Sequence, residues 1–235
     1  MGRVFEKRKY KMFARYDKMA KGFTRIGKEI AIAIKLGGGD PAGNSRLRLA
    51  IQNAKGLNMP KDRIDAAIKR ATSKDASNLE EVVYEGKAPY GIGILCECAT
   101  DNPTRTVANV RMHFNRNGGE LGKTGSLDYL FERKGVFRIK KENVNLEELE
   151  MDLIDFGAEE FEYDEEEIAV TTAFSDFGKM QKALEDRKLN IISSELERIP
   201  TSTVELTDEQ MEEVMNLVTK LEEEDDIQKV YHNLK

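Results

Sequence analysis

The sequence predicts an α+β protein: a small N-terminal helical bundle followed by two α/β sandwich-like domains, the third inserted in the second. Residues 21–71 carry apolar residues at helical spacing. The segments 80–132 and 200–235 alternate between strand and helix patterns that complete one sheet. Between them the order strand–helix–strand–strand–helix–strand is typical of a ferredoxin-like module.

These patterns divide the chain into three predicted domains. A basic helical domain with an N-terminal arm takes residues 1–76, and the polar stretch 72–79 reads as a linker. A middle α+β domain takes residues 77–132 plus 200–235. An acidic ferredoxin-like domain takes residues 133–199 and is inserted between the two parts of the middle domain.

The bundle is predicted as three short helices. The first runs over residues 21–36, and a second begins near Asn44 or Ser45, either of which is a good N-cap, and ends at Gly56. A third opens at Pro60, which suits a first helical position. Residues 1–20 are basic with scattered aromatics and are predicted as an arm, either bound to nucleic acid or folded back on the helices.

Strand patterns dominate the predicted middle domain. Strands are expected at 80–86 and 91–99, with a helix at 102–117. LDYLF, residues 127–131, is expected to be a further strand, with a helical turn as the alternative. After Pro200, TVEL reads as a strand. A helix then opens with a capping box at Thr207, and IQKVYH forms the last strand.

The inserted module is predicted from strands at 136–139, 159–163, 167–173 and 191–199, with helices at 146–156 and 175–188. RNA-recognition modules share this order, but they need stacking aromatics that EIAVTTAF lacks. No RNA binding is therefore assigned to this module. The carboxylates at 164–167 read as a solvated turn rather than a magnesium site, because runs of like charge stay exposed.

Charge is divided unequally along the chain. Residues 1–74 hold 19 Lys and Arg against 6 Asp and Glu, a net charge of +13, while the remainder holds 18 against 37, a net charge of −19. The local field is what a polyanion meets, so the basic half predicts a nucleic-acid surface despite the net charge of −6. Mutual attraction between the two halves is the alternative.

Composition also bounds the environment. The chain has no run of eighteen apolar residues and no apolar signal core behind its first basic residues, so no membrane span and no secretion are predicted. Cys96 and Cys98 would share one face of a strand, an arrangement poorly suited to a disulfide within the chain. A reducing cytoplasm is the expected location.

The stretch GGELGKTGSLDYLFERKG, residues 118–135, contains an apparent phosphate-binding motif. A P-loop needs a glycine five positions before Gly122, and that position is Asn117. The preceding segment also reads as a helix, where a P-loop requires a strand. Gly118 and Gly119 are better explained as a helix stop, and Gly122 and Gly125 as a turn into LDYLF.

The same stretch resembles the signature of the YebC/PmpR family. Similar motifs follow the family order along nearly the whole chain: LGGGDP at 36–41, NMPKD at 58–62, YEG at 84–86, TDN at 100–102 and DDIQKVYHN at 225–233. The opening GRVFEKRKYKMFARYDK departs from the usual GHSKWANIKHRK but keeps its basic character. The resemblance implies three domains and a DNA-binding transcriptional regulator, although some members act on translation at the ribosome.

Binding is expected rather than catalysis. His113 and His232 are the only histidines, and no serine–histidine–acid set, metal-ligand spacing or complete phosphate loop accompanies them. His113 reads as a helix-surface residue. No cofactor, metal or small-molecule substrate is expected. The predicted partner is DNA or ribosomal RNA, with an adaptor that binds a basic protein as a further possibility.

The candidate nucleic-acid-binding residues are the cations of the basic domain, which would contact phosphates and not read bases. They are Arg3, Lys7, Arg8, Lys9, Lys11, Arg15, Lys18, Lys21, Arg25, Lys28, Arg48, Lys55, Lys61 and Arg63.

Overall fold

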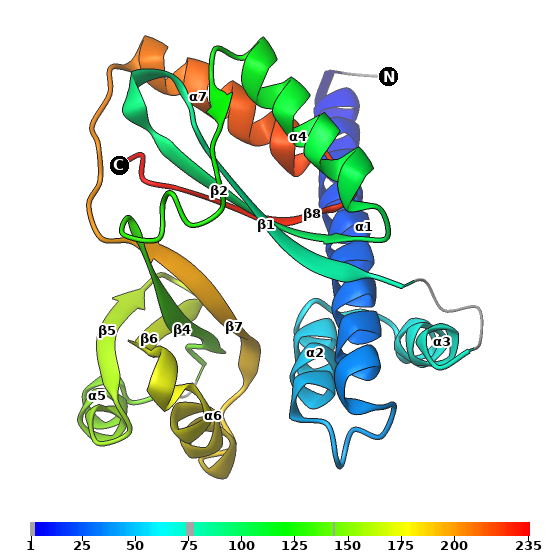
Figure 1. Ribbon diagram of the computed structural model, residues 1–235. Helices are drawn as coiled ribbons and strands as arrows, with labels where there is room; N and C mark the ends of the chain where they lie inside the picture. The colour runs from blue at the N-terminus through cyan, green and yellow to red at the C-terminus, as the bar shows by residue number, and fades with distance from the viewer. Residues whose placement is uncertain (1–2, 74–77, 143) are drawn as a thin grey trace. The chain divides into compact units, whose positions relative to one another are not determined.

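The computed structural model describes residues 3–73, 78–142 and 144–235, with side chains described from residue 19 onward. Two compact units divide it, Met1–Asn78 and Leu79–Lys235. Each has its own buried cores. The first unit is helical, and the second contains two four-stranded sheets (Figure 1). The α+β class predicted from the sequence is confirmed.

The helical unit consists of α1 (Arg3–Gly37), α2 (Ser45–Gly56) and α3 (Lys61–Ala71). Its core contains Ile26, Ile30 and Ala33 of α1, Leu47 of α2 and Ile64 of α3, which are the apolar stripes expected from the sequence. Asn44 caps α2, and its side-chain oxygen accepts from the Leu47 N–H at 3.0 Å. Pro60 is the N-cap of α3, one position before its predicted place.

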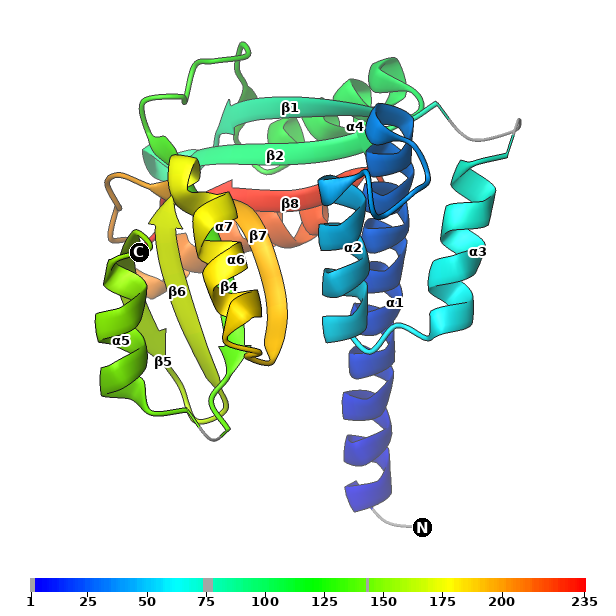
Figure 2. The same ribbon diagram turned by 90° about the horizontal axis from the view of Figure 1, so that it is seen from below.

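The prediction of an arm at residues 1–20 is wrong for the backbone, since α1 is one helix from Arg3 onward. Figure 2 shows the first half of α1 projecting past α2 and α3. The first described residue that packs against the core is Phe23. A helix rises about 1.5 Å per residue, so the part before Phe23 is about 30 Å long.

The first sheet of the second unit contains β1 (Glu80–Lys87), β2 (Gly93–Thr100), β3 (Glu120–Leu121) and β8 (Ile227–His232) in the order β3-β1-β2-β8. The helices α4 (Pro103–Arg116) and α7 (Asp208–Glu222) cover one face (Figure 1). Cys96 and Cys98 of β2 both point into this helix-covered core and are free thiols, as the strand alternation predicted. The capping box at Thr207 is present.

Two expected strands of this region are absent among the described residues. Residues 127–130 form turns, and only Phe131 of LDYLF is extended. Leu127 and Leu130 both pack with Leu95 in a small core on the sheet face away from the helices. They are three positions apart, a spacing that fits a turn and not the alternation of a strand. TVEL contributes a single bridge, between Val204 and Leu234.

The second sheet is the predicted ferredoxin-like module. It consists of β4 (Phe131–Lys140), β5 (Ala158–Tyr163), β6 (Glu167–Ala173) and β7 (Ile191–Pro200) in the antiparallel order β5-β6-β4-β7. The helices α5 (Leu146–Ile154) and α6 (Phe177–Asp186) pack on one face around Phe137, Ile139 and Ile168. The module lies between β3 and α7 in chain order, so it is an insertion.

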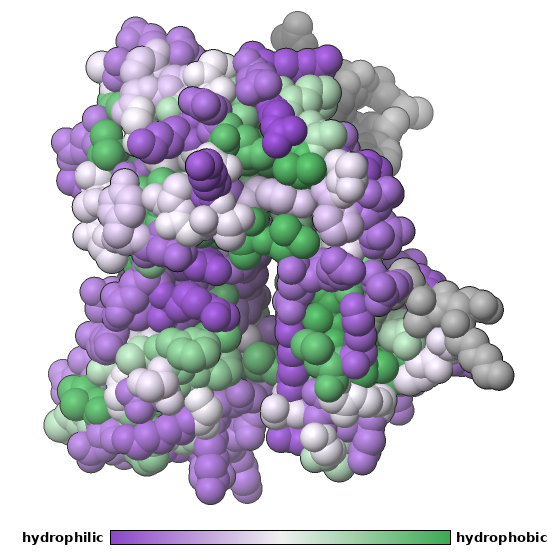
Figure 3. Space-filling view, in the orientation of Figure 1, coloured by the Kyte–Doolittle hydropathy of each residue, from purple (hydrophilic) through white to green (hydrophobic). Residues whose placement is uncertain are grey.

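Short 3-10 turns complete the element list, η1 (Pro89–Gly91) after β1 and η2 (Phe174–Asp176) before α6. No helix in the described part of the chain has the length and apolar character needed to cross a membrane. Hydrophilic side chains cover most of the face shown in Figure 3.

Candidate nucleic-acid interface

Cations of α1 lie opposite the core of the helical unit. Lys21, Arg25 and Lys28 fall at positions i, i+4 and i+7, which share one face of a helix. Lys21 is exposed, whereas Arg25 and Lys28 are half-buried. Ile26 and Ile30, on the other side of the helix, are buried in the core. Packing therefore fixes the direction in which this basic face points.

The cations of α2 and α3 divide into structural and open ones. Arg48 donates from Nη1 to the carbonyls of Pro41 and Ala42, at 2.8 and 2.9 Å, and so holds the loop before α2. Arg63 lies over the Phe23 ring, 5.8 Å from its centroid. Lys55 and Lys61 are exposed. Among the predicted residues with described side chains, these two and Lys21 are the exposed lysines.

The side chains of the seven N-terminal candidates lie outside the described residues. The backbone places all of them on the projecting half of α1: Arg3, Lys7, Arg8, Lys9, Lys11, Arg15 and Lys18. The structure therefore puts all 14 predicted residues on one unit.

The loop between α1 and α2 is built around Asn44. Its side-chain nitrogen donates to the carbonyls of Ala33 and Gly38, at 2.7 and 2.8 Å, while its oxygen caps α2. Asn44 is 5% exposed, so the LGGGDP motif and the following asparagine form a fixed connection. This loop sets the relative direction of the basic faces of α1 and α2.

The stretch 118–135 has a different structural basis. Gly118 ends α4 with φ 71°, the left-handed conformation expected for a helix stop. The helix α4 precedes this stretch, with only the two-residue strand β3 between it and Gly122, and turns follow at residues 124–130. A P-loop instead lies between a strand of the core sheet and a helix. The loop is held instead by the buried carboxylate of Glu85, a residue that sequence reasoning missed although it lies in the YEG motif.

The two histidines are both partly buried. His113 was predicted on the helix surface, but its side chain is 14% exposed and its Nε2 lies 2.7 Å from Glu224 Oε1, so that prediction is wrong. Asn109 donates to the other Glu224 oxygen at 3.1 Å. His232 lies on β8, where burial lowers its pKa against an opposing effect of Glu222.

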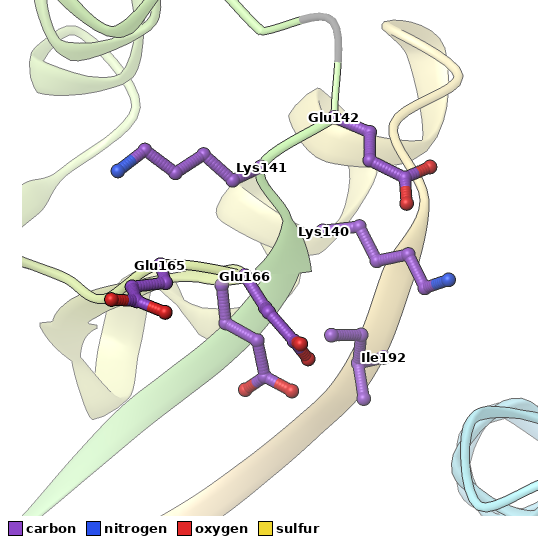
Figure 4. A pocket seen from close by; sticks show the side chains of 7 residues that line it. Lys140, Lys141, Glu142, Glu165, Glu166 and Ile192 are labelled. Atoms are coloured by element: carbon purple, nitrogen blue, oxygen red, sulfur yellow. The ribbon is translucent and has the colours of Figure 1, made fainter.

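A mixed-charge hollow of about 370 Å³ lies on the inserted module, between β4, β7 and the β5–β6 turn. Figure 4 shows Lys140 and Lys141 extending to opposite sides, with Glu165 and Glu166 on the turn. Asp164 Oδ1 accepts from the backbone N–H groups of Glu166 and Glu167, and these bonds lower its pKa. Within the described residues, no cluster of three or more His, Cys, Asp or Glu could hold a metal.

Comparison with known proteins places the chain. A family model described as the TACO1/YebC second and third domain matches residues 79–234, and one described as the TACO1/YebC N-terminal domain matches residues 3–74. The chain belongs to the TACO1/YebC family. The resemblance found in the sequence motifs is thus confirmed.

Relatives in this family cover the whole chain. A protein of Cytophaga hutchinsonii is 61% identical over 100% of this chain and 98% of its own, and one of Anaeromyxobacter dehalogenans is 54% identical over 100% of both. Each is named a probable transcriptional regulatory protein. The crystal structure of a conserved hypothetical protein from Aquifex aeolicus matches with a TM-score of 0.82 at 38% identity, covering 92% of this chain and 90% of that one.

The structure gives several TACO1/YebC motifs a common location. Asp226, from DDIQKVYHN, accepts hydrogen bonds from Thr100 of TDN at 3.1 Å and from Thr106 at 2.8 Å. It also accepts from Arg105 Nη2 at 2.8 Å. Asn233 Oδ1 accepts from the Gly93 N–H at 2.8 Å. These motif residues hold β2, α4 and β8 together.

Proposed function

We propose that this protein is a non-enzymatic regulator of gene expression that binds nucleic acid through its helical unit. The observation that carries the proposal is charge segregation: the +13 of residues 1–74 belongs to a unit with its own core, and the −19 belongs to the rest. The names of the relatives agree with a regulator. A basic surface of this kind attracts a polyanion over a long range.

In the first version of the proposal, the protein is cytoplasmic, binds DNA and regulates transcription. A second version has the same surface bind structured RNA on the ribosome and regulate translation. The α1–α2 connection favours the second version. It spans residues 38–44, whereas a helix-turn-helix motif uses a turn of only about three or four residues. Sequence-specific reading of the major groove lacks its usual element here.

Charge reversal tests the surface. Changing Lys9, Lys11, Arg15 and Lys28 to glutamate should weaken binding to all sequences about equally, because phosphate contacts position without reading bases. A matched variant reverses Lys140, Lys182, Lys188 and Lys220 of the acidic unit, with the same change in net charge. It should bind almost as the unchanged protein does, and equal losses in both variants would contradict a localised interface.

Competition binding at fixed salt separates the targets. Folded ribosomal RNA should compete better than random duplex DNA if the protein acts in translation. Clear preference for one DNA sequence would establish the transcription version instead. If the helical unit binds neither polymer, an adaptor that recognises a basic protein through the acidic domains is left.

A further inference from the structure

The loop between β3 and β4 is organised by one buried carboxylate. Glu85 of β1 is 3% exposed. Its Oε1 accepts from the Gly125 N–H at 2.8 Å, and its Oε2 accepts from the Leu127 N–H at 2.7 Å and from Ser126 Oγ at 3.3 Å. Burying a carboxylate is costly unless hydrogen-bond donors surround it, and these three donors all come from the loop.

Further contacts fix both ends of the same loop. The Gly122 N–H donates to the Glu85 carbonyl at 2.7 Å. Leu127 and Leu130 are buried at 2% and 7% exposure, and the Leu130 carbonyl accepts from the Thr201 N–H at 2.9 Å. Gly125 has φ 84°, a conformation that side chains rarely adopt. Residues 122–130 are thus held in one conformation.

This loop also exposes several side chains to solvent. Tyr129 is 73% exposed, between the two buried leucines in sequence, and Lys123 of the same loop is also exposed. Asp128 is also exposed, so residues 122–130 carry no net charge. An exposed aromatic ring and a lysine on a rigid loop are suited to binding a ligand, because the buried residues beneath the loop hold its backbone in place.

We propose that this loop is a second nucleic-acid contact, in which Tyr129 stacks on an unpaired base and Lys123 contacts an adjacent phosphate. The inference rests on the proposed function and adds a preference for single-stranded regions within a folded RNA. Stacking on an exposed ring requires no net positive charge, which suits a neutral loop on the acidic unit. The helical unit supplies the electrostatic attraction, and the loop selects unpaired bases.

The test compares an RNA hairpin containing an unpaired loop with a fully paired RNA duplex of the same stem, using the full-length protein. Tyr129→Ala should weaken hairpin binding about tenfold, because the aromatic ring that stacks on the unpaired base is lost, with duplex binding and the salt slope unchanged. Tyr129→Phe should keep hairpin affinity because it keeps the ring. Tyr163→Ala removes a tyrosine that is 40% exposed on β5 and is the matched control.

Lys123→Ala tests the phosphate contact. For the hairpin, it should reduce the magnitude of the slope of log K against log salt concentration by about one. Lys182→Ala, which removes an exposed lysine on α6, should leave that slope unchanged.

Glu85→Gln tests the positioning of the loop. In this variant an NH2 group replaces one of the two acceptor oxygens, so a hydrogen-bond donor faces the loop N–H groups. The affinity for the hairpin should therefore fall as it does in Tyr129→Ala, while the affinity for the duplex stays unchanged. If this variant does not fold, the Tyr129 and Lys123 comparisons still decide.

The outcomes separate the two proposals. Tyr129→Ala that binds the hairpin like the unchanged protein overturns the loop contact, while the charge-reversal result leaves the helical interface standing. A protein that binds neither RNA overturns both. Equal losses for Tyr129→Ala and Tyr163→Ala would show a general effect of surface aromatics and would also overturn the loop contact.

Discussion

In the second unit, single carboxylates join segments that lie far apart in the sequence. Asp226 gathers two buried hydroxyls, from Thr100 at 0% and Thr106 at 2% exposure, beside the guanidinium of Arg105. The sequence showed TDN and DDIQKVYHN as separate motifs, and only the pairing of β2 with β8 brings them together. Glu85 was missed for the same reason, because its donors lie about 40 positions away.

Asp226→Ala should lower the free energy of unfolding by about 2 kcal/mol, because buried hydroxyls lose their charged acceptor. Urea unfolding followed by circular dichroism measures it. Asp186→Ala, at an exposed position on α6, is the control and should change stability by less than about 0.5 kcal/mol. Equal effects for the two variants would show that the Asp226 cluster does not contribute.

His232 should make stability depend on pH. Burial lowers its pKa below 6.5, and its Nδ1 is buried without a hydrogen-bond partner among the described residues. The unfolded chain therefore binds a proton that the folded chain resists, so stability should fall as pH drops below about 6.5 and level off below the folded pKa.

His232→Gln should reduce the difference in unfolding free energy between pH 7.5 and pH 5.5, because the group that titrates differently is gone. Urea unfolding at the two pH values gives this difference for each protein. An unchanged difference would assign the pH dependence to the carboxylates.

At the scale of elements, apolar spacing predicted most of the structure. The stripes of α2, α3, α4 and α7 and the strands of the inserted module were found from sequence. The first half of α1 was not, because Phe5, Tyr10, Phe13 and Tyr16 do not make a continuous helical stripe. Its abundant lysine and arginine are good helix formers, so helix propensity, which the prediction did not use, accounts for this half of α1 better than apolar periodicity does.

Removing residues 1–18 should separate binding from folding. The described core of the helical unit begins at Phe23, so its thermal unfolding temperature should change little. The deletion removes seven cations and two carboxylates, so affinity for nucleic acid and the steepness of its salt dependence should both fall. Thermal circular dichroism and titration at several salt concentrations measure the two effects. Loss of the cooperative transition would show that the projecting half of α1 belongs to the fold.

For the whole molecule, the opposite net charges of the two units should make the intact protein bind a polyanion more weakly than its basic part does. The 1–78 fragment should bind a fully paired duplex more tightly than the full chain, because the net charge of −18 on residues 79–235 repels a polyanion until salt screens it. If about five phosphates are neutralised, the log–log salt slope on duplex DNA should be about −4 to −5. Raising the salt concentration should bring the two affinities together, since the repulsion is screened first. Fluorescence anisotropy of both proteins across a salt series measures this. A full chain that binds the duplex more tightly at every salt concentration would contradict this repulsion and would mean that the acidic unit contacts paired nucleic acid as well.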